Sequence, residues 1–318
     1  MSVMIISADT LRASVSFEDL IEPVSLAFQR SSAGQADNGQ ISMFPHPDQT
    51  RGDVLVKSGT LEGSPVYIVK VSPWFAINVE EGRPQGGFIA VFDATNGQTL
   101  ALLDDQHYLS DIRTAAAGAL AARVLAPLDV RTATVIGAGV QAYWQVLALY
   151  HERRFARLSI WARTTANAAL LADRLAPLLP QVDVRVETSL KRAVQLADVV
   201  ITATQSREPL VRGEWLCAGQ HITAVGADDA TKCELDAEAL RRSRVFVDTV
   251  ETALANGEVH RAVTSGDYSR KDIAGEIGDV LANRCIGRQS SNDITIATFA
   301  GIGAQDVVAA NVAIRSLI

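Results

Sequence analysis

A pair of glycines between an apolar run and a helix-forming run restricts the fold of this chain more than any other feature. The segment follows a predicted strand at 132–136 and reads Val135-Ile136-Gly137-Ala138-Gly139-Val140-Gln141-Ala142. A Gly-x-Gly-x-x-Ala pattern between a strand and a helix is the context required for dinucleotide binding. Gly137 allows a tight turn, Gly139 lets the backbone approach a pyrophosphate, and Ala142 lets the helix pack on the strand. The plainer interpretation, two turn glycines that join a strand to a helix, stays open.

The residues around this glycine pair favour a cofactor with phosphate groups. A helix predicted over 141–154 would direct its N-terminal N–H groups and partial positive charge at the phosphates. An acid that binds the ribose 2′-hydroxyl is expected about 20 residues after the glycines. Ala162 stands there instead, followed by Arg163 and Thr164. These two side chains favour NADP(H) over NAD(H), because both can bind a 2′-phosphate, although Arg163 could equally stack on adenine or lie in solvent.

The alternation of strands and helices after residue 131 predicts an α/β fold with parallel βαβ units. Strands are expected at 132–136, 158–161, 182–186, 198–202, 222–225 and 245–247, with helices at 141–154 and 167–175. The first third instead predicts an antiparallel sheet with a helix on it. That helix is expected over 17–30, capped by Ser16 and Asp19, and the strands at 53–57, 66–71, 88–93 and 99–103.

Two more helices are predicted outside these regions. An alanine-rich helix over 109–126, capped by Ser110 and ended by Pro127, is expected to join two domains. The second helical run covers 306–318, and the sequence does not fix its packing partner.

Composition limits the function classes that this chain can serve. A length of 318 residues predicts about two domains, and 48% hydrophobic with 20% charged residues predicts a large core. The net charge of −7 argues against a nucleic-acid-binding surface. Three cysteines without a Cys-x-x-Cys pair favour neither a metal site nor a disulfide framework. The sequence shows no signal peptide or long apolar stretch, so we expect a cytoplasmic enzyme that does not cross a membrane.

Several motifs, taken in their order and spacing, resemble the ornithine cyclodeaminase/μ-crystallin family over nearly the whole chain. Besides the glycine-pair segment they are Val69-Lys70-Val71, Val91-Phe92-Asp93, Leu100-Ala101-Leu102-Leu103-Asp104, Ile112-Arg113-Thr114-Ala115-Ala116-Ala117, Val200-Ile201-Thr202-Ala203-Thr204, Gly226-Ala227-Asp228 with Lys232 and Glu234-Leu235, and Glu276-Ile277-Gly278-Asp279-Val280-Leu281. The resemblance implies a Rossmann NAD(P)-binding domain at 115–304. It also implies a homodimer and a substrate-binding and dimerisation domain built from 1–114 and 305–318.

The resemblance further implies hydride transfer between a nicotinamide and the Cα of an imino or amino acid. Such a reaction needs a bound substrate carboxylate, a directed hydride and a proton for the nitrogen. Lys70, in an apolar strand, and Arg113, early in the long helix, are the candidates for holding the carboxylate, because a buried cation requires an anionic partner. From the residues alone, a structural salt bridge explains both equally well.

Asp228 follows a strand, at the edge where open α/β sheets bind ligands. The resemblance implies that it is the acid/base partner of the substrate nitrogen. Asp229 is its rival, as a second carboxylate or as a solvated neighbour, and a capping role for the pair is the alternative. The resemblance implies that the cofactor is also contacted by Thr114, Ala203, Thr204, Gly226 and Lys232.

Departures from the family predict a changed substrate pocket. Relatives often carry an arginine before the apolar strand, where this chain offers only Ser42, and Met-Pro where it has Lys57-Ser58. Together with His46, Ser42 and Lys57 could bind a second polar group, which favours a small dicarboxylate imine over ornithine. Lys57 could instead point to solvent.

We therefore expect an NAD(P)H-dependent reductase of a small α-imino acid, with iminosuccinate to L-aspartate as the preferred reaction. Two other activities stay open: an ornithine cyclodeaminase-type lyase that recycles its cofactor, and an alanine dehydrogenase or ketimine (pyrroline-2-carboxylate) reductase. A third alternative is a μ-crystallin-like binding protein, but the joint presence of Lys70, Arg113 and Asp228 argues against it.

Overall fold

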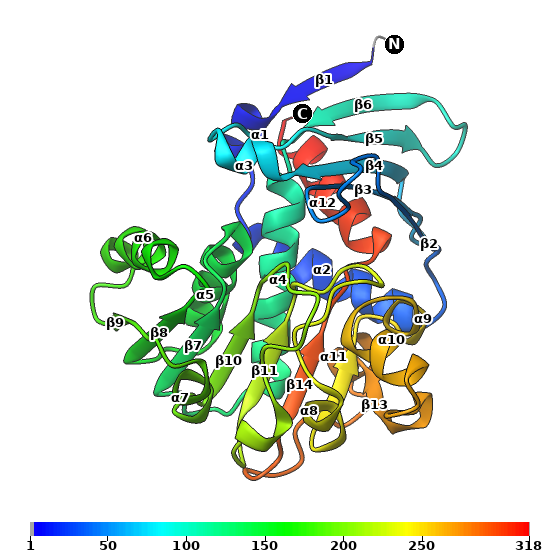
Figure 1. Cartoon of the computed structure of the whole chain (residues 1–318). Coiled ribbons are helices and arrows are strands. Elements are labelled where there is room, and N and C mark those ends of the chain that lie inside the picture. Colours follow the sequence, from blue (N-terminus) through cyan, green and yellow to red (C-terminus); the bar gives the residue numbers. More distant parts are fainter. Residues whose placement is uncertain (1–2, 318) are drawn as a thin grey trace. The chain divides into compact units, whose positions relative to one another are not determined.

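The computed structural model describes residues 3–317, which form two compact units. The first unit takes the chain up to Ala116 and the segment from Ile302 onward, and the second unit takes Ala117–Gly301. Each unit is built on one sheet, and the α/β class that the sequence predicts is confirmed (Figure 1). No helix among the described residues is long and apolar enough to span a membrane.

The sheet of the first unit has six strands in the order β1-β6-β5-β4-β3-β2. They are β1 Met4–Ser7, β2 Asn38–Met43, β3 Gly52–Gly59, β4 Val66–Phe75, β5 Phe88–Asp93 and β6 Thr99–Asp104. Neighbouring strands are antiparallel except β1 and β6, which run parallel. The four predicted strands are confirmed. The sequence did not indicate β1, which is short, or β2, which is largely polar and exposed at the sheet edge.

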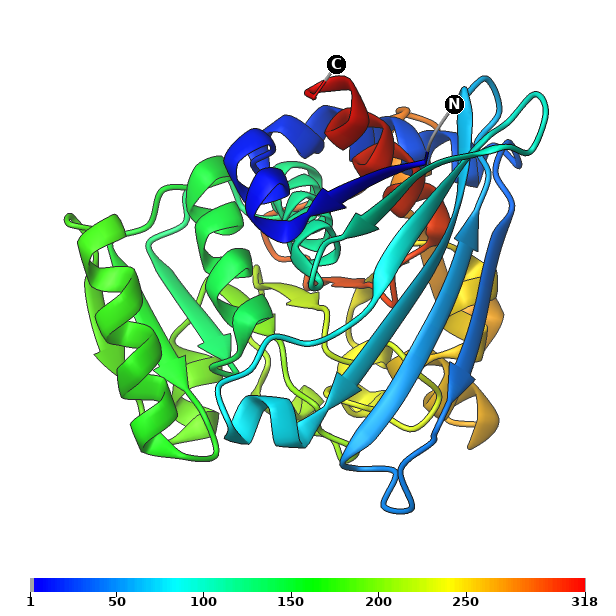
Figure 2. The same ribbon diagram turned by 90° about the horizontal axis from the view of Figure 1, so that it is seen from above.

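The C-terminal helix packs on one face of this sheet, called here the inner face, and a second helix packs on the C-terminal helix. The C-terminal helix α12 (Gly303–Arg315) contacts α2 (Glu18–Ser32), β3 and β4, as Figure 2 shows for the red and blue helices. Two shorter helices, α1 (Ala8–Ser14) and α3 (Ala76–Glu80), complete the unit. The predicted cap of α2 is confirmed, because Ser16 N donates to Asp19 Oδ2 at 2.8 Å and Asp19 N donates to Ser16 Oγ at 3.3 Å.

Two other glycines, Gly59 on β3 and Gly303 on α12, allow α12 to begin directly against β3. A Cβ on Gly303 would overlap the carbonyl of Ser58, and one on Gly59 would overlap the Gly303 backbone. The Asn38 side chain accepts a hydrogen bond from Ala304 N at 2.8 Å, which satisfies one amide of the first helical turn. The first turn of α12 is therefore held on β3 by close backbone contact and on β2 by the Asn38 side chain.

The long helix α4 (Tyr108–Leu125) is confirmed, but its predicted cap is wrong. The helix begins two residues before Ser110, and Asp105 Oδ2 accepts the hydrogen bond from Leu109 N at 3.1 Å. Ser110 lies inside the first turn instead, where its Oγ accepts from Lys70 Nζ at 3.0 Å. Asp and Ser are equally good capping residues, so the sequence alone could not choose between them.

The second unit contains an eight-stranded sheet in the order β13-β12-β14-β11-β10-β7-β8-β9, in which every neighbouring pair is parallel. The strands are β7 Thr132–Ile136, β8 Arg157–Trp161, β9 Asp183–Val186, β10 Val199–Thr202, β11 His221–Ala224, β12 Arg244–Val247, β13 Ile273–Glu276 and β14 Thr295–Thr298. The six predicted strands are confirmed, and the short strands β13 and β14 were not predicted.

The strand order of this sheet determines where it can bind a ligand. The chain moves outward from β7 to β8 and β9 on one side, then returns to place β10 and β11 on the other (Figure 1). Open α/β sheets bind ligands at the carboxyl ends of their strands where this direction changes. The connecting helices are α5 Val140–Glu152, α6 Thr165–Leu175, α7 Leu190–Gln195, α8 Ala237–Arg241, α9 Val250–Ala255, α10 Gly257–Thr264 and α11 Ile277–Leu281.

Candidate functional site

The glycine pair forms a turn between β7 and α5 at the predicted ligand edge. Gly137 has a positive φ of 122° and donates its N–H to Trp161 O at 2.8 Å, while a side chain there would overlap the Ala203 carbonyl. Gly139 immediately precedes α5, and nothing lies within 4 Å of a Cβ placed on it. Ala142 is fully buried. The turn therefore has the shape that a pyrophosphate needs, with open space beside Gly139 and a helix N-terminus behind it.

The end of β8 carries no acidic partner for a ribose. The stretch from Trp161 to Ala172 contains no Asp or Glu, and Arg163 and Thr164 are both exposed. Thr164 immediately precedes α6 without capping it through its side chain. Both side chains are accessible to a 2′-phosphate, and their predicted role stays a prediction.

The first unit holds a cluster of buried charges on the inner face of its sheet. Lys57 on β3 and Lys70 on β4 are cross-strand neighbours, so both side chains project from that face. Asp306, in the first turn of α12, accepts hydrogen bonds at Oδ1 from Lys70 Nζ (2.8 Å) and Arg113 Nε (3.1 Å). The side chains of Lys70, Arg113 and Asp306 are 3%, 7% and 1% exposed. Ion pairs this deep are stable only when their geometry compensates for lost hydration.

The electrostatics of this cluster favour binding of an additional anion. Burial raises the pKa of Asp306, but Lys70, Arg113 and Lys57 outweigh that effect and hold the pKa below its ordinary value. Burial lowers the pKa of the Lys70 ammonium, partly offset by Asp306, and raises the pKa of Asp105. The positive charges of Lys57, Lys70 and Arg113 thus converge on the carboxylate of Asp306. A carboxylate ligand would bind the same cations by charge-assisted hydrogen bonds.

Two buried polar atoms beside this cluster have no hydrogen-bond partner among the described residues. They are Oδ2 of Asp306 and Nε2 of Gln305. The Gln305 Oε1, in contrast, accepts hydrogen bonds from Arg113 Nη1 at 3.2 Å and from Ile302 N at 3.0 Å. Buried polar atoms are nearly always satisfied in folded proteins, so these two atoms suit a bound ligand or water.

The structure therefore brings three predicted residues, Lys57, Lys70 and Arg113, together around Asp306. Ser42 and Thr114, which were also predicted, are more exposed than these three. Lys57 does not point to solvent, because only 3% of it is exposed. Ser42 lies one cross-strand pair further along the same face but is exposed. Thr114, predicted to contact the cofactor, is half-buried and donates its hydroxyl to Ser110 O at 2.8 Å. The sequence analysis missed Asp306, although a carboxylate in an otherwise apolar helical run was a usable signal.

The second unit presents Asp228 after β11, at the carboxyl edge of its sheet. Lys232 Nζ lies 2.6 Å from Asp228 Oδ1 and 3.3 Å from Asp229 Oδ2. The Asp228 side chain is 33% exposed, whereas that of Asp229 is 2% exposed. Asp229 accepts hydrogen bonds from the amide and hydroxyl of Thr231 and from Lys232 N. Asp229 therefore closes a turn and is not a solvated neighbour, which leaves Asp228 as the accessible carboxylate.

The remaining predicted cofactor residues lie at the ends of β10 and β11. Ala203 follows β10 directly, and its carbonyl packs against Gly137. Thr204 and Gly226 each donate a backbone N–H to the buried carboxylate of Glu234, at 2.6 and 2.9 Å. The structure thus places both residues at the ligand edge, next to the glycine turn.

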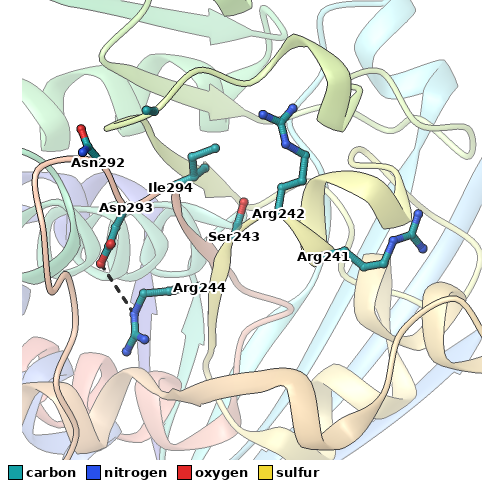
Figure 3. Close-up of a pocket in the computed structure, with 8 residues that line it drawn as sticks. Arg241, Arg242, Ser243, Arg244, Asn292, Asp293 and Ile294 are labelled. Atoms are coloured by element: carbon teal, nitrogen blue, oxygen red, sulfur yellow. Dashed lines mark ion pairs between the residues drawn. The ribbon is translucent and has the colours of Figure 1, made fainter.

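Two surface hollows in the second unit lie away from this edge. Figure 3 shows one lined by Arg241, Arg242, Arg244 and Asp293, beside the amino ends of β12 and β14. Its guanidinium groups are already engaged, Arg241 with Glu238, Arg242 with Leu216 O and Arg244 with Gly287 O. The other hollow, lined by Arg131 and Ala156 among others, lies at the amino ends of β7 and β8. Ligands of such sheets bind at the opposite ends of the strands, so neither hollow is the candidate site.

Comparison with known proteins supplies a family. Residues 1–316 match the model of the ornithine cyclodeaminase/mu-crystallin family. An uncharacterized cyclodeaminase of Sinorhizobium fredii is 38% identical over 271 residues, covering 85% of this chain and 81% of that relative.

Two of the solved structures that match over 99% of this chain carry names that bear on its chemistry. The Δ1-pyrroline-2-carboxylate reductase of Thermococcus litoralis, in complex with NADH and L-proline, has a TM-score of 0.91 at 28% identity and is covered over 97% of its length. The iminosuccinate reductase of Paracoccus denitrificans, in complex with NAD⁺, has a TM-score of 0.88 at 26% identity and is covered over 96%. Both are named as reductases, and both contain a bound nicotinamide dinucleotide.

Proposed function

Because the chain belongs to the ornithine cyclodeaminase/mu-crystallin family, as predicted, we propose that it is an NAD(P)H-dependent reductase of a small α-imino acid. The observation that carries this proposal is the convergence of three buried cations, Lys57, Lys70 and Arg113, on Asp306, whose Oδ2 has no hydrogen-bond partner among the described residues. A structural salt bridge needs one cation for one carboxylate, whereas an enzyme for a carboxylate substrate needs further cations to bind it. The glycine turn supports a dinucleotide cofactor.

In the proposed reaction, Lys70 and Arg113 hold the α-carboxylate of the substrate by charge-assisted hydrogen bonds. Asp306 fixes the direction of both cations, since it binds each of them at Oδ1. Asp228 passes a proton to the substrate nitrogen, directly or through a water, and Lys232 holds the Asp228 carboxylate in place. A bound reduced nicotinamide supplies the hydride for the imine carbon. The cofactor would be held by residues 137–141 and by Thr114, Arg163, Thr164, Ala203, Thr204, Gly226 and Lys232.

The buried position of Lys57 supports a substrate with a second carboxylate. Its ammonium projects from the same sheet face as Lys70, where it attracts a second anionic group and repels the side-chain ammonium of ornithine. We therefore propose iminosuccinate, reduced to L-aspartate, as the substrate.

A 340 nm assay with NADH and then NADPH tests this proposal. The imines are generated from ammonia with oxaloacetate, pyruvate or glyoxylate, and preformed pyrroline-2-carboxylate is tested beside them. We expect the fastest cofactor oxidation with oxaloacetate. Oxidation only with the cyclic or short imines would assign a ketimine reductase or alanine dehydrogenase. Ammonia release from ornithine without net oxidation would establish the cyclodeaminase alternative, and tight dinucleotide binding without any turnover would support a binding protein.

Lys57→Met is expected to change substrate selectivity. We predict that kcat/KM for the oxaloacetate-derived imine falls about 10- to 100-fold, the value of one charge-assisted hydrogen bond, while kcat/KM for the pyruvate-derived imine stays within about threefold. Steady-state kinetics with both imines measures the ratio, and Lys191→Met, an exposed lysine, is the matched control. An equal loss with both imines would remove Lys57 from side-chain recognition.

The outer face of the first unit's sheet supports the homodimer that the resemblance implies. Ile41, Val56, Val71 and Phe88 lie in cross-strand register on the face opposite Lys57 and Lys70. Ile41 is 62% exposed and Phe88 is 40% exposed, and contiguous apolar surface of this kind marks protein interfaces.

We expect Val71→Asp to convert a dimer into a monomer in sedimentation, because it places a charge at the centre of this face. Leu196→Asp, which alters an exposed leucine in the second unit, should leave the dimer intact. A dimer that survives the Val71 substitution would place the interface elsewhere.

A further inference from the structure

A buried glutamate joins the ends of two neighbouring strands at the ligand edge of the second unit. Glu234 is fully buried and accepts four hydrogen bonds. Its Oε2 accepts from Thr202 Oγ1 at 2.7 Å and Gly226 N at 2.9 Å, and its Oε1 accepts from Thr204 N at 2.6 Å and Thr204 Oγ1 at 2.7 Å. Thr202 ends β10, and Gly226 follows β11.

These hydrogen bonds close the loop that carries Asp228. Because Glu234 binds the amide of Gly226, the two ends of the segment 226–234 are tied together, with Asp228 and Lys232 between them. The loop is also held from outside, since Gly257 N donates to Asp229 O at 3.0 Å.

The same carboxylate fixes the segment against which both ligand-edge glycines pack. A Cβ on Gly226 would overlap the Thr204 backbone, and one on Gly137 would overlap the Ala203 carbonyl. Glu234 thus determines the position of Ala203 and Thr204 relative to the glycine turn on one side and the Asp228 loop on the other.

We propose that Glu234 is a positioning residue for the reduction: its ionised carboxylate ties the ends of β10 and β11 together and thereby sets Asp228 for proton transfer. This inference rests on the proposed function, because Asp228 matters only if a proton is transferred. Glu234 itself acts through Thr204 and Gly226. Two of its four donors are backbone amides, which cannot reverse direction as a hydroxyl can, so both of its oxygens must accept.

A second buried carboxylate makes this arrangement sensitive to pH. Glu258, on α10, accepts hydrogen bonds from Glu234 N at 3.1 Å and from Thr298 Oγ1 at 3.0 Å. Burial, and then the proximity of Glu258, raise the pKa of Glu234 to about 7, and burial raises the pKa of Glu258 as well. The hydrogen-bond donors that the ends of β10 and β11 direct at Glu234 are hydroxyls and backbone amides, which carry no charge.

The loop of Glu234 carries further ionisable side chains, and Arg261 on α10 acts on one of them, Cys233. Asp229 and Lys232 form an ion pair, and burial raises the pKa of Cys233 to about 12, which keeps that thiol neutral. Protonation of Glu234 below pH 7 places a hydrogen on one carboxylate oxygen. Because each oxygen accepts a hydrogen bond from a backbone N–H, of Thr204 or Gly226, protonation weakens one of these two hydrogen bonds.

Two isosteric substitutions separate positioning from simple structural support. In Glu234→Gln the new NH₂ group must face an amide N–H of Thr204 or Gly226, and no rotation of the side chain avoids this conflict. In Glu258→Gln the NH₂ group can face Thr298 Oγ1, because that hydroxyl can reverse and accept. The second variant is therefore a matched control that removes a buried charge but keeps both hydrogen bonds.

The first experiment measures kcat at saturating imine and cofactor between pH 6 and 8.5, with dinucleotide affinity from protein fluorescence. For Glu234→Gln we expect kcat, measured with the cofactor saturating, to fall at least 30-fold at pH 8, a larger factor than the rise in the dinucleotide Kd. Wild-type kcat should fall as the pH drops through about 7, and Glu258→Gln should shift this acid limb to lower pH, because it removes the neighbouring charge. A kcat for Glu234→Gln within threefold of wild type, a parallel loss of dinucleotide binding, or an unshifted acid limb would each overturn the proposal.

Hydrogen exchange supplies a readout that does not depend on activity. The amides of Thr204 and Gly226 should exchange at least tenfold faster in Glu234→Gln than in wild type, and at the wild-type rate in Glu258→Gln. Unchanged exchange in Glu234→Gln would refute the positioning role itself. If exchange responds as expected but wild-type protein oxidises no cofactor with any imine, the proposed function fails instead.

Discussion

Asp228→Asn is expected to lower kcat/KM for the imine by about 10²- to 10⁴-fold, the usual contribution of a positioned proton donor. The amide keeps the size of the side chain and an oxygen that can accept from Lys232 Nζ, which lies 2.6 Å from the carboxylate. It has no acidic proton to give to the substrate nitrogen. The loss should therefore appear in kcat, while the Kd for the dinucleotide stays within about twofold.

The controls for this variant are chosen from the same unit. Asp173→Asn alters an exposed carboxylate on α6 and should retain wild-type kinetics. Steady-state kinetics at 340 nm and fluorescence titration of the dinucleotide give the two quantities. If Asp228→Asn keeps kcat/KM within threefold of wild type, the proton comes from another donor and the proposed role of Asp228 is wrong.

Asp306→Ala is expected to reduce the free energy of unfolding by about 3–5 kcal/mol. The substitution removes the carboxylate that both Lys70 and Arg113 bind, and leaves these two side chains buried without that partner. Glu80→Ala, which removes the partner of Arg51 in an ion pair whose side chains are 42% and 50% exposed, should cost about 1 kcal/mol or less. Denaturant unfolding of both variants measures the difference.

The same variant tests whether the cation cluster binds anions. Sulfate or succinate should raise the Tm of Asp306→Ala more than that of wild type, because the anion replaces the missing negative charge. Equal shifts in both proteins would show that the cluster is closed to anions, contrary to its proposed role with the substrate carboxylate.

The contribution of Asp306 to stability has a defined pH dependence. Its pKa in the folded protein lies below the ordinary value of 3.8, so the unfolded chain binds more protons in acid. Its stabilising effect is therefore fully present above pH 3.8 and is lost only as the pH falls through the lower, folded-state pKa. Wild type and Asp306→Ala should differ most at neutral pH and converge in strong acid.

Local patterns in the sequence predicted much of the candidate site. The glycine turn was predictable because its turn, close approach and helix packing all depend on residues within one short segment. Lys70 was predictable because an ammonium within an apolar strand is costly unless it has a partner. The predicted cap at Ser110 was wrong, because Asp105, five positions earlier, is an equally good capping residue and accepts the hydrogen bond from Leu109 N.

The features that could not be predicted depend on contacts between distant parts of the chain. Asp306 binds Lys70 across 236 positions of sequence, and no local pattern indicates that pairing. Strand β14 is four residues long and lies between β11 and β12, so its position in the sheet follows from the chain's path rather than its own composition. The positioning role of Glu234 could not be predicted either, because its four hydrogen bonds come from residues at the ends of two other strands.

The attachment of α12 to β3 has a consequence for the order of folding. The first unit is discontinuous, because the whole segment Ala117–Gly301 lies between its two parts in the sequence. The ion pair of Lys70 with Asp306 therefore closes a loop of 236 positions, and a loop of that length costs conformational entropy. The segment Ala117–Gly301 can form its own sheet first, because domains fold as units. We therefore expect Lys70 and Arg113 to gain their carboxylate partner late in folding, when α12 docks on β3.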